Sequence, residues 1–121
     1  MRALSVVIPA LNEYENIARV LEAVPTERLT AEGWRTEVIV VDNGSTDGTA
    51  DVVADFAKTA PFPVKYVRED RPGHSLALNT GCRAATGDVV VFTDDDAFPA
   101  AGWLTAIHDA FVRHAADWVY G

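Results

Sequence analysis

The sequence predicts an α/β protein with a doubly wound, mostly parallel β-sheet and helices on both faces. Short apolar runs rich in β-branched residues alternate along the chain with segments whose apolar residues recur at helical spacing. The runs lack the polar alternation of half-exposed strands, so each strand is expected to be buried on both faces. Alternating strands and helices of this length favour right-handed crossovers between parallel strands.

Four strands are expected, each ended by polar or turn-forming residues. The first ends at Pro9, which has no N–H to donate to a ladder. The second is followed by the turn-rich residues 42–48, and the fourth runs directly into three aspartates. The expected strands are residues 4–8, 37–41, 64–67 and 88–93.

Four helices are expected between and after these strands. Asn12 is expected to cap the first helix, with Glu15 as its capping-box partner and Pro25 as its end. Apolar residues then recur on one helical face. The markers of the four helices are Ile17, Val20, Leu21 and Val24; Val52, Val53 and Phe56; residues 75–85; and Trp103, Ile107, Ala110 and Phe111.

Composition excludes several classes of protein. The 121 residues hold 10 basic and 18 acidic side chains, and the net charge of −8 argues against nucleic acid or an anionic membrane as the main partner. We identify no signal peptide and no membrane-spanning stretch. A single cysteine, Cys82, permits no intrachain disulfide, which suits a cytoplasmic location, and we expect Cys82 to be a small core residue.

The last residues, 118–121, resemble the start of another strand, so we expect a truncated sheet. A truncated sheet exposes an edge, which favours self-association as a homo-oligomer.

In doubly wound sheets, ligands bind outside the carboxyl ends of the strands. Three polar clusters lie there: residues 9–13, 42–47 and 94–96. Asp94, Asp95 and Asp96 repel one another unless a cation neutralises them, and hard oxygen ligands suit Mg²⁺ or Mn²⁺. Alternate residues point the same way, so Asp94 and Asp96 are the candidate metal ligands. The alternative is a solvated acidic turn in which Asp95 or Asp96 caps a helix.

The other clusters also allow two interpretations. Asp42 could accept a hydrogen bond from a nucleobase N–H or a ribose hydroxyl, or it could only shape the turn that follows. Asn12 fits a helix cap better than a ligand, and Glu13 fits either role. The basic side chains near these clusters could meet a phosphate group or could be solvated surface residues; they are His74, Arg68, Arg71 and Arg83.

Four segments in register resemble the family 2 glycosyltransferases with the GT-A fold. The resemblance covers almost the whole chain in order, and the four together are far more specific than any one of them. The segments are residues 5–13 (SVVIPALNE), residues 40–49 (VVDNGSTDGT), Gly73 with residues 77–81 (ALNTG), and residues 85–88 (ATGD) leading to residues 92–96 (FTDDD).

The resemblance implies that residues 1–121 form the nucleotide-sugar-binding part of a GT-A domain, without the acceptor-binding part. Asp42 matches the carboxylate that contacts the donor base, and Gly73 and the helix of Asn79 flank the donor pocket. Asp94 and Asp96 match the ends of the DXD motif, which meets the ribose and, through its last aspartate, the metal on the diphosphate. The implied nucleotide-sugar contacts are Pro9, Ala10, Asn12, Glu13, Asp42, Gly73, Asp94 and Asp95.

The implied activity is metal-dependent transfer of a sugar, with inversion, from a UDP- or GDP-linked donor to an unidentified acceptor. The family's catalytic base lies after the DXD motif. Only two carboxylates follow Asp96, namely Asp109 and Asp117, and neither matches a catalytic motif. The base is therefore expected beyond Gly121, and a non-catalytic nucleotide-binding or regulatory fragment is the alternative function.

Two other enzyme classes fit less well. A phosphatase with an aspartate nucleophile would carry its motif on the first strand and a later lysine, whereas the last lysine here is Lys65. A dinucleotide-binding oxidoreductase would carry a GxGxxG motif after the first strand, and the sequence has none there.

Overall fold

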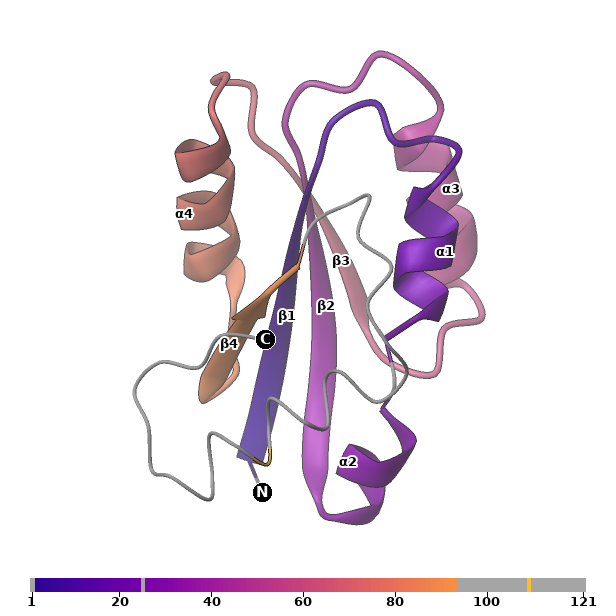
Figure 1. The fold of residues 1–121 in the computed structure, drawn as a ribbon, viewed down its shortest axis with the longest axis vertical. Helices are drawn as coiled ribbons and strands as arrows, with labels where there is room; N and C mark the ends of the chain where they lie inside the picture. Colours follow the sequence, from indigo (N-terminus) through magenta and orange to yellow (C-terminus); the bar gives the residue numbers. More distant parts are fainter. Residues whose placement is uncertain (1, 25, 94–108, 110–121) are drawn as a thin grey trace.

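A computed structural model describes residues 2–24, 26–93 and 109 of the chain. Its four-stranded sheet is parallel throughout, with strand order β3-β2-β1-β4 (Figure 1). The chain adds β2 and β3 on one side of β1 and then β4 on the other, so the strand order reverses between β1 and β4, which is the topological switch point. The strands are β1 (Arg2–Ala10), β2 (Trp34–Asp42), β3 (Val64–Arg68) and β4 (Val89–Phe92).

Helices cover both faces of this sheet, which confirms the predicted doubly wound architecture. In Figure 1, α1 and α3 lie side by side against one face and α4 lies against the other. The short α2 packs against β2 near the end where the strands begin. The helices are α1 (Ile17–Glu22), α2 (Glu27–Ala31), α3 (Thr49–Ala57) and α4 (His74–Ala84).

Two apolar clusters, one on each face, follow from the alternation of side chains along the strands. Val6 of β1 and Val38 of β2 pack with Leu21 of α1 in the larger cluster. Val7 of β1 belongs to the smaller cluster, beneath α4. Burial on both faces explains why β1 and β2 are apolar with almost no polar alternation.

Glycine lets α4 approach this second face closely. A Cβ atom on Gly81 would lie 2.3 Å from Cγ1 of Val7 and 3.2 Å from Cγ2 of Val41. Both neighbours belong to buried strand residues with little room to move, so the distance between helix and sheet requires glycine here.

The predicted first helix begins later and ends earlier in the structure. The residue that precedes α1 is Asn16, not Asn12, and it makes no side-chain capping bond. The backbone carbonyl of Glu13 instead accepts a hydrogen bond from the N–H of Ile17 at 2.8 Å. The capping-box prediction for Asn12 and Glu15 is therefore wrong.

Other boundaries also differ from the prediction. β1 continues through Pro9, whose pairing partner is Val41 of β2. Helix α2 was not predicted, and Cys82 is exposed on α4 rather than buried. The predicted helix after β4 lies outside the described residues except for Asp109, which is helical. Among the described helices, none is long and apolar enough to cross a membrane.

Candidate functional site

The loops after β1, β2 and β3 leave the sheet at the same end, uppermost in Figure 1. This carboxyl edge brings together two of the three predicted polar clusters, because β1 and β2 are neighbours. The backbone N–H of Asn43, after β2, donates to the carbonyl of Ala10, the last residue of β1, at 2.8 Å. The two loops therefore start from a shared hydrogen bond.

Asn12 joins these two loops. Its N–H donates to Oγ of Ser45 at 2.9 Å, and its side-chain Oδ1 accepts from the N–H of Thr46 at 2.9 Å. Its backbone is left-handed, with φ 52°, a conformation that asparagine tolerates better than most residues. Asn12 thus holds the loop after β1 against the loop after β2.

The other predicted residues of the first cluster have different environments. Pro9 and Ala10 are buried within β1, and Ala10 packs in the larger apolar cluster. Glu13 is half-buried in the loop, where its Oε2 accepts from Nδ2 of Asn16 at 3.0 Å. Of this cluster, Asn12 and Glu13 therefore present the polar side chains at the carboxyl edge.

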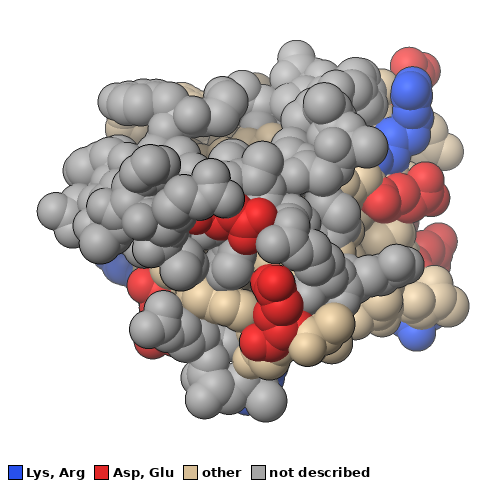
Figure 2. Space-filling model, turned by 60° about the horizontal axis from the view of Figure 1, so that its bottom comes forward, with Lys and Arg blue, Asp and Glu red and all other residues tan. Residues whose placement is uncertain are grey.

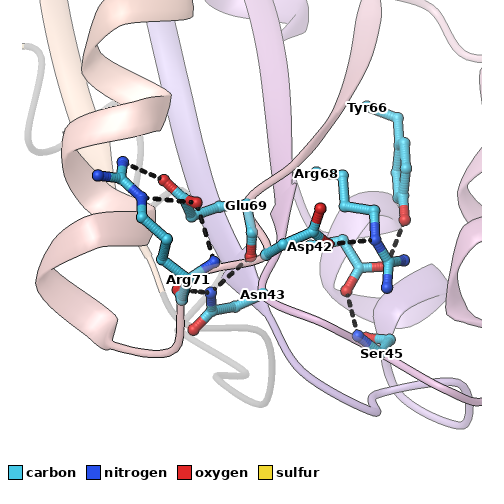
Figure 3. A network of polar contacts seen from close by, with 8 residues as sticks. Asp42, Asn43, Ser45, Tyr66, Arg68, Glu69 and Arg71 are labelled. Carbon is cyan, nitrogen blue, oxygen red and sulfur yellow. Dashed lines mark hydrogen bonds and ion pairs between the residues drawn. The ribbon is translucent and has the colours of Figure 1, made fainter.

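Asp42, the last residue of β2, is fully buried (Figure 3). Its Oδ1 accepts from the N–H of Ser45 at 2.8 Å, and its Oδ2 accepts a short hydrogen bond from the hydroxyl of Tyr66. Burial and the bond to Asp42 raise the pKa of Tyr66 to about 12, so the phenol is neutral and donates. Both carboxylate oxygens of Asp42 thus have a donor within the protein.

A second polar network, which includes Asn43, lies next to that of Asp42 (Figure 3). Nδ2 of Asn43 donates to the carbonyls of Glu69 and Arg71, both at 2.8 Å. Its Oδ1 accepts from the N–H of Gly73 at 3.2 Å. Gly73 has φ 139°, which only glycine adopts readily, and it immediately precedes α4. Asn43 therefore fixes the loop between β3 and α4.

Glu69 is the centre of this network and was not predicted from the sequence. Its carboxylate accepts from Nε and Nη2 of Arg71 at 3.2 and 2.7 Å and from Oγ1 of Thr80 at 2.8 Å. These bonds, that of Arg71 first, lower the pKa of Glu69 to about 2. The signal was its position just after a strand, the same signal that identified Asp42.

The other basic candidates are not brought together. Arg68 pairs with Asp70 through its Nε at 2.7 Å, and Arg71 pairs with Glu69. His74 and Arg83 are exposed at opposite ends of α4.

The predicted metal ligands Asp94, Asp95 and Asp96 lie outside the described residues. The preceding residue, Thr93, donates its N–H to the carbonyl of Val7 at 3.1 Å, so the chain reaches residue 93 beside β1. Among residues 2–24, 26–93 and 109, no group of three or more histidine, cysteine, aspartate or glutamate side chains could hold a metal ion.

The opposite edge, where the strands begin, carries a different polar cluster around Glu37. Its Oε2 accepts from Oγ of Ser5 at 2.6 Å and from the N–H and hydroxyl of Thr86 at 2.8 and 2.9 Å. Its Oε1 pairs with Nζ of Lys65 at 2.7 Å. Burial opposes ionisation, but these hydrogen bonds outweigh it and lower the pKa of Glu37 to about 2.

A pocket of about 400 Å³ also lies at this opposite edge, lined by Trp34, Thr36, Phe62 and neighbouring residues. None of the predicted site residues lines this pocket. Figure 2 turns this end of the molecule forward, and the described acidic side chains lie at several separate places on the visible face. The pocket is therefore distinct from the candidate site at the carboxyl edge.

Comparison with known proteins identifies the chain's relatives. The sequence model described as Glycosyl transferase family 2 matches residues 5–121. Glycosyltransferase AglE of Haloferax volcanii is 37% identical over 101 residues, which is 84% of this chain and 33% of AglE.

Two solved structures extend the comparison. Mannosyltransferase PcManGT from Pyrobaculum calidifontis, in complex with GDP-Man and Mn²⁺, is 36% identical with a TM-score of 0.75 over 89% of this chain and 32% of its own. S. aureus TarS in complex with UDP-GlcNAc is 25% identical with a TM-score of 0.75 over 97% of this chain and 33% of its own. The chain thus spans about a third of each of these relatives. It belongs to glycosyl transferase family 2 and has the GT-A fold of those structures.

Proposed function

We propose that this chain binds a UDP- or GDP-linked sugar at the carboxyl edge of its sheet, together with Mg²⁺ or Mn²⁺. In the complete enzyme this part would serve transfer of the sugar, with inversion, to an acceptor hydroxyl. The observation that carries the proposal is the convergence at one edge of the loop after β1, the loop after β2 and the end of β4. Hydrogen bonds between Asn12 and residues 45–46 join the first two, and Thr93 bonds to β1.

In this proposal the residues contact different parts of the nucleotide-sugar donor. Asp42, with Asn12, Glu13 and the backbone of Pro9 and Ala10, would surround the base. Gly73 would flank the nucleotide-sugar site at the carboxyl edge, where its lack of a side chain leaves the start of α4 open. Asp94 and Asp95 would contact the nucleotide sugar. GDP-Man and UDP-GlcNAc bound to the two similar structures support a nucleotide-sugar donor.

The chemistry of the donor set fits a divalent cation. Asp94 and Asp96 follow β4 directly, and carboxylate oxygens are the ligands that Mg²⁺ and Mn²⁺ prefer. When bound on a diphosphate, such a cation offsets the charge that develops on the leaving group. The Mn²⁺ in the PcManGT complex supports this assignment.

Calorimetry with UDP and GDP tests the proposal. Binding should require Mn²⁺ or Mg²⁺, disappear in EDTA and be lost in the Asp96→Ala variant. Asp55→Asn, which removes an exposed charge on α3 far along the helix from the carboxyl edge, is the matched control and should bind normally. If Asp96→Ala binds either nucleotide in EDTA as tightly as the unmodified protein does with metal, the proposal is wrong.

A second function is favoured by one observation, namely that the chain spans about a third of the length of each of the three relatives compared above. Asp109 and Asp117 are the only carboxylates after Asp96. The chain alone would then bind the donor without turning it over. Nucleotide binding without release of sugar from UDP-GlcNAc or GDP-Man would support this function, and sugar transfer by the chain alone would exclude it.

A further inference from the structure

The carboxylate of Asp42 has no exposed surface, although it lies at the edge where a donor would bind. Its Oδ1 is held by the backbone of Ser45 within the turn after β2. Its Oδ2 is held by the side chain of Tyr66, from the neighbouring strand β3. Because the carboxylate has no exposed surface, a ligand that hydrogen-bonds to Asp42 must first move one of these two groups aside.

The two donors differ in how readily they can leave. The Ser45 N–H is part of the backbone of a turn that Asn12 also holds, and Ser45 itself is 8% exposed. Tyr66 is 37% exposed, so its ring already lies partly at the surface and its hydroxyl can be hydrated when it turns away. Of the two, the Tyr66 hydroxyl is the donor that a ligand can displace at lower cost.

We infer that the Tyr66 hydroxyl occupies, in the free protein, the position of a nucleobase N–H. When the nucleotide sugar binds, the nucleobase N–H displaces the Tyr66 hydroxyl from Oδ2 of Asp42. The inference rests on the proposed function of Asp42 as the contact to the base. Tyr66 keeps a buried carboxylate hydrogen-bonded in the free protein, where an unpartnered charge would be costly. When the nucleotide binds, the nucleobase N–H replaces the Tyr66 hydroxyl as the hydrogen-bond donor to Oδ2 of Asp42.

This exchange selects among bases by their hydrogen-bonding pattern. Uracil presents N3–H and guanine presents N1–H to a carboxylate, and both can replace a phenol O–H. Cytosine and adenine present a ring-nitrogen acceptor at the corresponding position, which an ionised carboxylate repels. UDP and GDP should therefore displace the Tyr66 hydroxyl from Asp42 and bind, whereas CDP and ADP should not.

The Tyr66→Phe variant tests the inference by calorimetry with UDP and GDP in the presence of Mn²⁺. Phenylalanine keeps the ring but removes the competing donor, so the nucleotide no longer has to break a hydrogen bond to a charged group. We expect binding about tenfold tighter, which corresponds to about 1.4 kcal/mol. Tyr14→Phe, which removes a hydroxyl from an exposed tyrosine, should bind with unchanged affinity.

The opposite direction of change overturns the inference. If Tyr66→Phe binds UDP and GDP as tightly as the unmodified protein or more weakly, Tyr66 orients Asp42 and does not occupy the position of the nucleobase N–H. Failure of the proposed function looks different, because Asp96→Ala in EDTA would then bind UDP or GDP as tightly as the unmodified protein does with metal, whatever Tyr66→Phe does.

A measurement on the otherwise unmodified sequence keeps the inference testable if Tyr66→Phe does not fold. The chain has three tyrosines, so fluorotyrosine labelling gives three ¹⁹F resonances, which Tyr14→Phe and Tyr120→Phe assign by elimination. UDP with Mg²⁺ should move the Tyr66 resonance toward that of a solvated fluorotyrosine. A Tyr66 resonance unchanged at saturating UDP contradicts the exchange.

Discussion

Replacing Glu37 with glutamine should destabilise the fold without changing the shape of the side chain. Glu37 is 11% exposed and accepts hydrogen bonds from β1, from β3 and from the connection between α4 and β4. Glutamine keeps one acceptor oxygen and turns an NH₂ group toward either Lys65 or the donors of Ser5 and Thr86. Either the Lys65 ammonium group or the Ser5 and Thr86 donors would therefore face an N–H group instead of an acceptor oxygen.

The pKa of Glu37 sets the size of the effect. A decrease from 4.5 to about 2 corresponds to at most about 3 kcal/mol of stability. Lys65 is 41% exposed, so solvent screens its contribution and we expect a loss of about 2 kcal/mol. In urea denaturation this loss lowers the midpoint by about 1 M at an m-value of about 2 kcal/mol/M.

The pH dependence separates this reasoning from a general packing defect. Because the folded-state pKa is lowered, the contribution of Glu37 is fully present above about pH 4.5 and is lost as pH falls toward 2. The difference between the unmodified protein and Glu37→Gln should be constant near neutral pH and shrink below pH 4.5. Asp55→Asn, which breaks a pair whose side chains are 75% and 79% exposed, should change stability by less than about 0.5 kcal/mol. A Glu37→Gln effect as small as this, or one independent of pH, would show that the ionised Glu37 carboxylate does not stabilise the fold.

Two further substitutions test the close contacts on either edge of the sheet. Gly87→Ala would place a Cβ atom 2.7 Å from Oγ of Ser5 and 2.9 Å from the carbonyl of Ala3, so we expect a loss of about 1–3 kcal/mol in urea denaturation; unchanged stability would mean that the connection before β4 can move aside. Asn12→Ala removes the acceptor of the Thr46 N–H and puts alanine at φ 52°. Hydrogen exchange at Thr46 should become at least about tenfold faster, and unchanged protection would show that Asn12 does not join the two loops.

The two central strands, β1 and β2, were predictable from the sequence because burial on both faces leaves a plain signal. The expectation of burial on both faces is wrong for β3 and β4, whose residues, Val91 aside, are half-buried or exposed. Residues 4–8 and 37–41 are continuous apolar runs, and the structure extends each one into β1 and β2. The alternation of strands with helices then restricted the topology to a doubly wound sheet. These features depend on local sequence, which a single chain displays directly.

The features that the sequence did not reveal depend on contacts between distant residues. Asn12 resembled a helix cap, but its side chain bonds to a backbone N–H 34 residues away. Cys82 was placed in the core, whereas α4 buries Ala77 and Gly81 against the sheet, small residues that leave a weak apolar pattern. Helix α2 has five residues, too few for a helical period to be visible.

The site was predictable to a similar degree. The position of Asp42 after β2 identified it as a candidate, but its pairing with Tyr66 depends on the register of β3. Glu69 lies in an equivalent position and has no motif around it. The assignment of Asp94, Asp95 and Asp96 stays a prediction from the sequence.

A metal-bound nucleotide is expected to lie at the carboxyl edge of the sheet. Paramagnetic relaxation by Mn²⁺ tests it most directly, because Mn²⁺ broadens amide resonances near the site where it binds. With UDP or GDP present, Mn²⁺ should broaden the amides of Asn12, Ser45 and Thr93 and leave those of Thr36 and Thr86, at the opposite edge, sharp. Broadening centred on Thr36 and Thr86, or no nucleotide-dependent broadening at Asn12 and Ser45, would show that the metal-bound nucleotide does not lie at the carboxyl edge.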